Sequence, residues 1–161
     1  MEQAEEDVLK SVTIQKLSKY IEWPENVLKK DDSSPFVIGA IGRTDFDSIL
    51  RTIYKDNKIK GKQVKIKKVR SIHEIFGCHV LYIAETAKKI LPDIINFTRD
   101  KPILTISDTT GFAEKGVLIN IVIKGNKIRF EINEKGTYNS GIKVSSMIKR
   151  FSKIIDPLKP N

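Results

Sequence analysis

The sequence predicts an α/β fold, a sandwich of a mixed β-sheet with flanking helices that ends in a β-hairpin and a C-terminal helix. Two observations predict it. Short apolar runs typical of strands alternate with helical patterns, and these runs cover residues 36–41, 64–69, 80–84 and 103–107. Two alternating runs then flank Gly125-Asn126, which predicts a two-residue hairpin turn. No repeat or linker divides the 161 residues, so we expect residues 1–161 to form one domain.

The first helix is predicted over residues 5–21. Ile14, Leu17 and Ile21 are spaced three and four apart, which places them on one face. Trp23-Pro24 ends this helix, because a proline disfavours the α conformation in the residue before it. We therefore expect a loop after residue 24.

Proline and apolar spacing also define the later helices. Pro92 suits a first helical turn and would interrupt a continuous helix, so residues 86–97 are predicted to be helical in two pieces. Residues 145–155 are predicted to form the last helix, with Ile148, Phe151 and Ile155 turned inward.

The net charge of +9 is concentrated between Lys55 and Arg70, where Asp56 is the single acidic residue. Within residues 64–69, Lys65 and Lys67 alternate with apolar residues, as on the solvated face of an edge strand, where lysines prevent edge-to-edge pairing. No aromatic side chains interleave these lysines to stack on bases, so nucleic acid is not an expected partner.

The hairpin has two chemically different faces. The turn pairs Lys124 with Lys127, and the register that follows places apolar residues together on one face: Ile119, Ile121 and Ile123 against Ile132, Phe130 and Ile128. The other face carries Leu118, Asn120 and Val122 opposite Asn133, Glu131 and Arg129. That polar face is a candidate partner or ligand surface, although a plain solvated face is the commoner case.

No catalytic set emerges from the sequence. Cys78 and His79 are adjacent, and neighbouring residues on a strand point to opposite faces, so they cannot form a nucleophile-base pair. Asp108-Thr109-Thr110-Gly111 resembles the motif of aspartic proteases, with an extra threonine and no second copy in the chain; a turn is the alternative. We therefore expect no catalytic residue.

Cofactors and metals are not expected either. The glycines of residues 39–42 do not match a dinucleotide-binding motif, although a small anion could dock on the helix start near Thr44. One cysteine with two histidines cannot complete a tetrahedral zinc site within one chain. No apolar run approaches the ~18 residues of a membrane span.

Several blocks, in order, make the chain resemble the YfiR-like family over residues 10–152. They are Tyr20-Ile21-Glu22-Trp23-Pro24, residues 77–83 and 102–108, Gly111-Phe112-Ala113, Gly116 with Ile119-Asn120, residues 129–133 and residues 141–146. Lys115, where a glycine is usual, and Gly136 and Tyr138 depart from the family pattern.

The resemblance implies a periplasmic, often homodimeric domain, whose export signal we expect upstream of residue 1. A well-known relative represses a membrane-anchored diguanylate cyclase from the periplasmic side. That relative has paired cysteines, whereas this chain has only Cys78, so disulfide control is not transferred. The expected partner is the periplasmic domain of a membrane-bound receptor or diguanylate cyclase, with a small molecule as a further ligand.

Three functions remain open at this point. The leading one is a non-enzymatic sensory domain that modulates a membrane-anchored signalling protein. The alternatives are an extracytoplasmic small-ligand-binding module without a cyclase partner, and a hydrolase that uses Asp108 or the Cys78 region.

The candidate binding residues come from two parts of the sequence. Glu22, Trp23 and Lys143 lie in family blocks rich in polar and aromatic residues, although core packing is the commoner role of a tryptophan such as Trp23. The polar hairpin face contributes Asn120, Arg129, Glu131 and Asn133.

Overall fold

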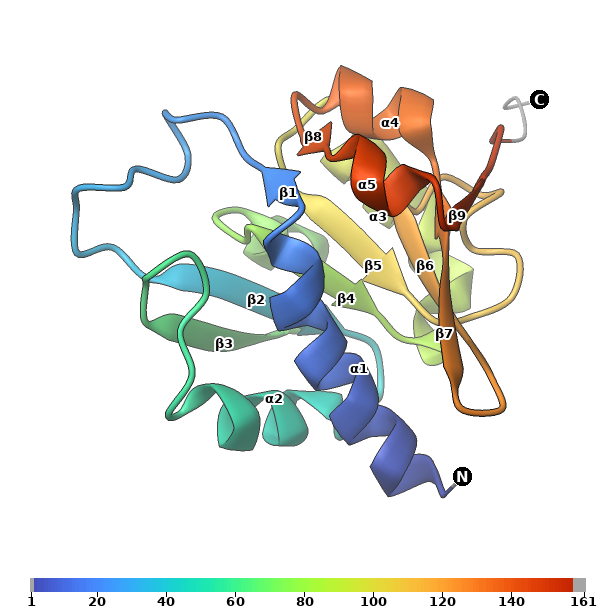
Figure 1. The fold of residues 1–161 in the computed structure, drawn as a ribbon, viewed down its shortest axis with the longest axis horizontal. Helices are drawn as coiled ribbons and strands as arrows, with labels where there is room; N and C mark the ends of the chain where they lie inside the picture. The colour runs from blue at the N-terminus through green and yellow to red at the C-terminus, as the bar shows by residue number, and fades with distance from the viewer. Residues whose placement is uncertain (1, 158–161) are drawn as a thin grey trace.

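The computed structural model describes residues 2–157 and confirms the α/β fold, with a seven-stranded mixed sheet between helices (Figure 1). The helices are α1 (Gln3–Ser18), α2 (Phe46–Tyr54), α3 (Leu91–Thr98), α4 (Glu134–Asn139) and α5 (Ser146–Lys149), with two 3-10 helices, η1 (Ile72–Ile75) and η2 (Glu85–Ile90). The strands are β1 (Ile21–Glu22), β2 (Phe36–Ile41), β3 (Val64–Val69), β4 (Val80–Ile83), β5 (Leu104–Ser107), β6 (Ile119–Lys124), β7 (Lys127–Ile132), β8 (Lys143–Val144) and β9 (Ser152–Ile154). Among the described helices, none is both long and apolar enough to cross a bilayer.

The strand order in the large sheet is β3-β2-β4-β5-β6-β7-β9. The pairs from β3 to β6 are all parallel, whereas β7 runs antiparallel to β6. The chain passes from β2 through α2 to β3 on one side, and then returns to place β4 on the other side of β2. The order of the sheet therefore reverses between β2 and β4, which makes this pair the topological switch point of a doubly wound fold.

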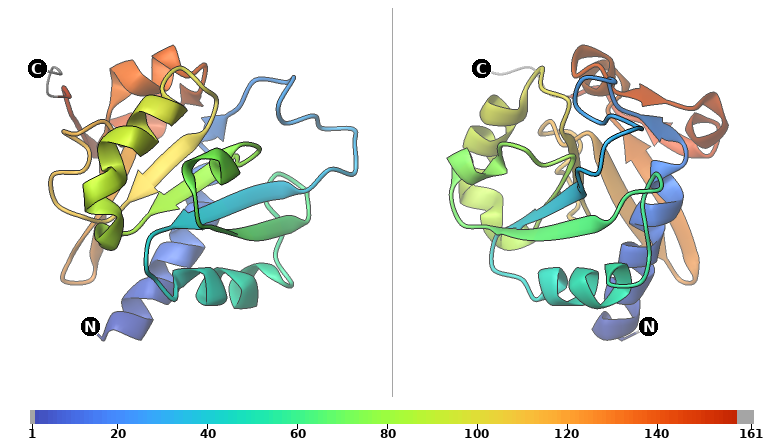
Figure 2. Two further views of the ribbon diagram at one scale, coloured as in Figure 1. Left: turned by 180° about the vertical axis from the view of Figure 1, so that it is seen from behind. Right: turned by 90° about the vertical axis from the view of Figure 1, so that its left-hand side faces the viewer.

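Helices cover both faces of the sheet. Figure 2 shows α1 and α2 against one face and α3 against the other. The strand β2 supplies both cores, because its residues alternate between the faces: Phe36, Ile38 and Ala40 pack with α1 and α2, and Ile41 packs with α3. All four residues of β4 are buried, as its low polarity predicts for a central parallel strand.

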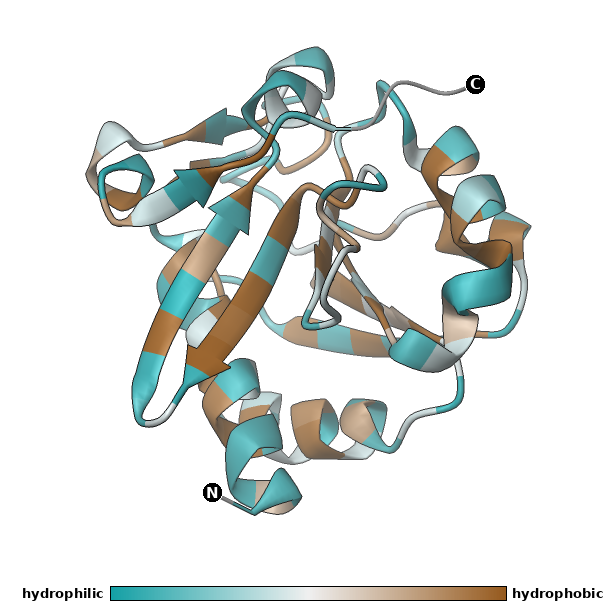
Figure 3. Ribbon diagram, turned by 90° about the vertical axis from the view of Figure 1, so that its right-hand side faces the viewer, coloured by the Kyte–Doolittle hydropathy of each residue, from teal (hydrophilic) through white to brown (hydrophobic). Residues whose placement is uncertain are grey.

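The two predictions about edges and turns are confirmed. The basic strand β3 is at the outer edge of the sheet; Lys65 is exposed there as predicted, whereas Lys67 is half-buried and its neighbour Lys68 is exposed. The hairpin β6–β7 has the predicted register, with Lys124 opposite Lys127 and Ile121 opposite Phe130. Figure 3 shows hydrophilic and hydrophobic residues alternating along β7, whereas β6 is mainly hydrophobic.

The predicted last helix differs from the structure. Helix α5 ends at Lys149, and the chain then forms the strand β9 parallel to β7. Phe151, which helical spacing placed inward, is 75% exposed. The strand prevails because its pairing satisfies backbone groups on the outer edge of β7; the amide of Ile155, for example, donates to the carbonyl of Ile132 at 2.8 Å.

The two other helix predictions are close to the structure. Helix α1 covers most of the predicted segment, residues 5–21, but ends at Ser18. Ile21 already belongs to β1. The helical segment around Pro92 is divided as predicted, since η2 ends at Ile90 and α3 begins at Leu91.

The polar face of the hairpin is partly buried, which corrects the view of it as a single solvated surface. Asn120 is 1% exposed and connects two neighbouring side chains. The Ser107 hydroxyl donates to Asn120 Oδ1 at 2.6 Å, and Asn120 Nδ2 donates to Glu131 Oε1 at 2.8 Å. Arg129 is exposed, so only the distal part of this face is solvated.

A cluster of rings connects the loop after β1 with β2 and β4. The Trp23 and Phe36 rings pack edge to face at 5.3 Å, and Phe36 stacks on His79 at 5.1 Å. His79 Nδ1 accepts a hydrogen bond from the Val37 amide at 2.9 Å, so the proton of the neutral ring lies on Nε2, which donates to the Val27 carbonyl at 2.9 Å. Burial lowers the pKa of His79.

This environment predicts that acid destabilises the protein through His79. The unfolded chain binds a proton near the ordinary pKa of about 6.5, whereas the folded chain stays neutral until the pH falls to its lower pKa. The free energy of unfolding should therefore decrease as the pH falls below about 6.5 toward the folded-state pKa. Urea denaturation at pH 7.5 and 5.5 measures this change. His79→Asn should abolish it and His73→Asn, at an exposed position, should not; an unchanged pH dependence in His79→Asn would contradict the assignment.

The two parts of the polar hairpin face should respond differently to truncation. Asn120→Ala leaves the Ser107 hydroxyl and the Glu131 carboxylate without their partner, and should lower the free energy of unfolding by about 1–3 kcal/mol. Arg129→Ala, at an exposed position of the same hairpin, should change it by less than about 0.5 kcal/mol. Equal losses in urea denaturation would show that the hairpin face is uniform.

Candidate functional site

The residues that the sequence singled out do not converge on one pocket. Glu22 and Lys143 face each other across the two-stranded β1–β8 ribbon, and both are exposed. Trp23 is buried in the core, where its indole N–H donates to the His79 carbonyl at 3.0 Å. The location of Trp23 agrees with core packing, the commoner of the two roles considered for it. Glu22 and Lys143 remain surface candidates.

A polar crevice of about 620 Å³ opens at the carboxyl ends of the parallel strands. Its floor comes from the residues that follow β2, β4 and β5, its roof from the first half of α1, and one wall from β6. This is the switch point of the sheet, where doubly wound folds bind their ligands. The fold itself therefore marks this crevice as the candidate site.

A buried ion pair fixes α1 over the crevice. Lys10 is 5% exposed, and its ammonium group pairs with the carboxylate of Asp108, which follows β5. The Tyr82 hydroxyl from β4 donates to the other Asp108 oxygen at 3.0 Å. Burial and the nearby Asp108 charge raise the pKa of Tyr82, so its hydroxyl stays protonated and continues to donate. Helix, strand and loop thus meet at one carboxylate.

The loops after β2 and β4 also contact each other across the switch point. The Arg43 amide donates to Thr86 Oγ1 at 2.7 Å, and the Thr86 hydroxyl lies 3.2 Å from the Arg43 carbonyl. The chain turns at Gly42 with a φ of 105°, and a Cβ there would lie 2.9 Å from the Ala84 Cβ. Glycine is thus needed both for the turn and for the close approach of the two loops.

The rim of the crevice is rich in basic and hydroxyl side chains. Arg43, Lys88 and Lys115 line it, and within residues 2–157 no carboxylate lies within ion-pair distance of these three. Thr44 and Thr109 add hydroxyl groups. The β6 wall is apolar and consists of Ile121 and Ile123. Such a lining can bind a polar ligand and orient it.

The described residues supply this crevice with no nucleophile-base pair. Cys78 packs in the core on the α3 side, where burial raises the pKa of its thiol, while His79 stacks on Phe36 in the other core. Asp108 is neutralised by Lys10. Between residues 2 and 157, no cluster of three potential metal ligands is present. The polar lining of the crevice can bind a ligand.

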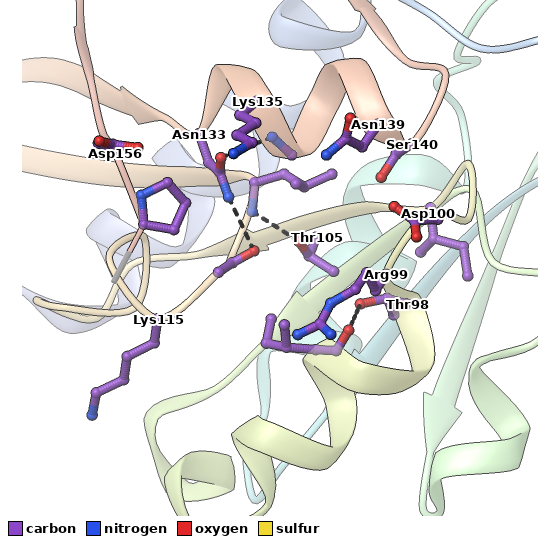
Figure 4. A pocket seen from close by; sticks show the side chains of 16 residues that line it. Thr98, Arg99, Asp100, Thr105, Lys115, Asn133, Lys135, Asn139, Ser140 and Asp156 are labelled. Atoms are coloured by element: carbon purple, nitrogen blue, oxygen red, sulfur yellow. Dashed lines mark hydrogen bonds between the residues drawn. The ribbon is translucent and has the colours of Figure 1, made fainter. Parts of the chain in front are cut away.

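A second cavity of about 370 Å³ lies between α3, α4 and the beginning of β5 (Figure 4). Asn133, one of the predicted site residues, lines it and caps α4, its Oδ1 accepting from the Gly136 amide at 2.9 Å. A Cβ on Gly136 would lie 2.6 Å from Leu118, so the glycine at this position allows the tight packing of α4. Asn133 is thus both a helix cap and a cavity residue.

The crevice was not predicted from the sequence, apart from the anion site suggested near Thr44. The signal was present, because polar residues directly follow three predicted strands: Arg43-Thr44, Glu85-Thr86 and Asp108-Thr109. Finding the site required the strand order, since only neighbouring parallel strands bring such residues to one edge.

Solved structures share this fold. The ABC domain from Streptococcus pneumonia in complex with L-Trp has a TM-score of 0.52 and 14% sequence identity, over 88% of this chain and 61% of that chain. The ligand-free, open structure of a substrate binding protein with adhesive properties from Clostridium difficile has a TM-score of 0.58 and 15% identity, over 83% of this chain and 59% of that chain. This chain therefore spans about three fifths of the length of either structure.

Sequence comparison places the chain in a family. No curated protein matches it significantly. A family model described as YfiR/HmsC-like matches residues 7–153, nearly the whole chain, which confirms the resemblance seen in the sequence. The protein belongs to the YfiR/HmsC-like family of periplasmic regulators.

Proposed function

We propose that this protein is a non-enzymatic periplasmic regulatory domain that binds a membrane-anchored signalling protein, such as a diguanylate cyclase, and represses it in response to a small ligand. The observation that supports this most is the crevice of about 620 Å³ at the switch point. Its charged and hydroxyl lining suits binding, and the family is one of regulators.

The hairpin offers a route from the crevice to a partner. Ile121 and Ile123 of β6 line the crevice, while Arg129 of β7 lies opposite Val122 and is exposed on the other face. A shift of this hairpin on ligand binding would therefore also move Arg129. We propose Arg129 and Glu131, together with the exposed pair Glu22 and Lys143, as contacts for the receptor's periplasmic domain.

A second candidate function is a ligand-binding module without a cyclase partner. The two similar folds favour it, since one structure is in complex with L-Trp and the other is a substrate binding protein. Both candidates need the crevice, but only the first needs a partner surface.

We also propose that the domain is a homodimer whose second copy covers α5 and β9. Apolar side chains are exposed along this segment, with Met147, Phe151 and Ile154 among them. The strand β9 is at the outer edge of the sheet, so its free backbone groups are available to another strand.

A cellular assay tests the regulatory function. The exported protein is produced together with a membrane-anchored diguanylate cyclase that carries a periplasmic domain, and cyclic di-GMP is measured. The protein should lower cyclic di-GMP, and Arg129→Ala should weaken this repression without a change in melting temperature beyond a few degrees. Lys65→Ala, on the distant edge strand β3, is the matched control. Unchanged cyclic di-GMP and no co-purification with the cyclase would leave the ligand-binding module as the function.

Light scattering of the purified chain tests the dimer. The wild type should have twice the mass of one chain, and Phe151→Glu should be monomeric, because a charge would be buried in the proposed interface. Phe76→Glu is the control, since Phe76 is equally exposed but lies after η1. A monomeric wild type at micromolar concentration would refute the homodimer.

A further inference from the structure

We propose that the crevice at the switch point binds a small organic anion, an apolar skeleton that carries a carboxylate or phosphate group. This inference rests on the proposed function, in which the crevice holds the regulatory ligand, and adds the chemical class of that ligand. Three properties of the crevice support it: its charge, a buried cation with unused donors, and an apolar wall.

The lining of the crevice carries a net positive charge when the Lys10–Asp108 ion pair is not counted. Lys10 and Asp108 neutralise each other. The remaining charged side chains are three cations against two carboxylates: Arg43, Lys88 and Lys115 against Glu6 and Glu85. No ion pair within residues 2–157 joins these five side chains, so the cations are available to an incoming anion.

Lys10 provides the most specific feature. An ammonium group has three N–H donors, and among the described residues only Asp108 accepts from Lys10 at hydrogen-bond distance, Asp7 lying 3.7 Å away. The side chain is 93% buried and lines the crevice. The remaining N–H donors of this ammonium group can therefore bind an anionic oxygen of a ligand in the crevice.

The apolar wall indicates that the anion has a carbon skeleton. Ile121 and Ile123 from β6 and Phe112 from the loop after β5 line the side of the crevice. A volume of about 620 Å³ is that of a typical small-molecule site. A bare inorganic ion would leave this wall in contact with water, whereas an organic anion covers it.

Such a ligand would bind α1 to the sheet. Lys10 belongs to α1 and Arg43 follows β2, so one anionic group between them bridges the helix and the strand end. Residues 2–5 at the start of α1 are exposed, so this end of the helix has few other contacts to the domain. Ligand binding should therefore slow amide hydrogen exchange in α1 more than in α3.

Probes with one skeleton and different charges test the ligand class. Phenylacetate, phenyl phosphate and phenethylamine are titrated into the full chain by calorimetry, with inorganic phosphate as the bare ion. At least one of the two organic anions should bind and protect α1 from hydrogen exchange, and the comparison of these two shows which anionic group the site takes. Phenethylamine should bind more weakly than the organic anions, because its ammonium group meets three cations against two carboxylates.

Variants locate the binding. The double variant Arg43→Gln with Lys88→Gln should weaken anion binding by about tenfold to hundredfold, the loss expected when a charge-assisted hydrogen bond is removed. The control is Arg99→Gln, which removes a cation from the second cavity and should leave binding unchanged. Equal affinity in the double variant and the wild type, or tighter binding of phenethylamine than of both anions, would overturn the anionic ligand class.

The cyclase assay separates the two proposals. If no anion binds while the crevice variant still loses repression in cells, the ligand class is wrong and the regulatory function stands. If anions bind in the crevice but neither the anion nor the variant changes cyclic di-GMP, the ligand class stands and the regulatory function is wrong.

Discussion

The parallel pairing of β2 with both β3 and β4 is the constraint on which the rest of the structure depends. It aligns Ile41 of β2 with Val69 on one side and Ile83 on the other, so that the carboxyl ends of these strands lie along one edge. A parallel pair cannot be joined by a tight turn, and the connections must cross the faces of the sheet. The helices therefore cover both faces, the polar loops gather at one edge, and α1 packs across that edge through Lys10.

Local rules account for the parts of the fold that the sequence predicts well. A two-residue turn at Gly125-Asn126 allows only one hairpin register. A proline at position 92 interrupts a continuous helix, so a new helix must begin beside it. The segment after Ser145 shows the limit of such rules. Its spacing of apolar residues is helical, but the free edge of β7 offers hydrogen bonds to whichever segment lies beside it, and β9 takes them. That competition depends on tertiary structure, which periodicity does not encode.

The candidate site was harder to predict for a related reason. The alternation of polar and apolar residues along the hairpin predicts its two faces correctly. It does not predict which part of a face is covered by another element. Ser107 of β5 and helix α4 pack against the inner part, so Asn120 and Asn133 serve structure, while Arg129 stays in solvent. In the crevice, by contrast, Arg43, Thr86 and Asp108 are far apart in sequence and come together only through the strand order.

The Lys10–Asp108 pair explains why this edge of the sheet is prepared for a ligand. Removing two charges from water offsets most of their mutual attraction, so a buried pair adds little net stability. Folding has nevertheless already desolvated the Lys10 ammonium and fixed its position against Asp108, whose other oxygen accepts from the Tyr82 hydroxyl. An anion that enters the crevice meets a cation that needs no further dehydration or ordering. The free-energy cost of desolvating and ordering this cation on binding is therefore reduced. The same reasoning distinguishes Lys10 from the exposed Lys65 and Lys68 of β3, which would have to be dehydrated and ordered before they could hold a ligand.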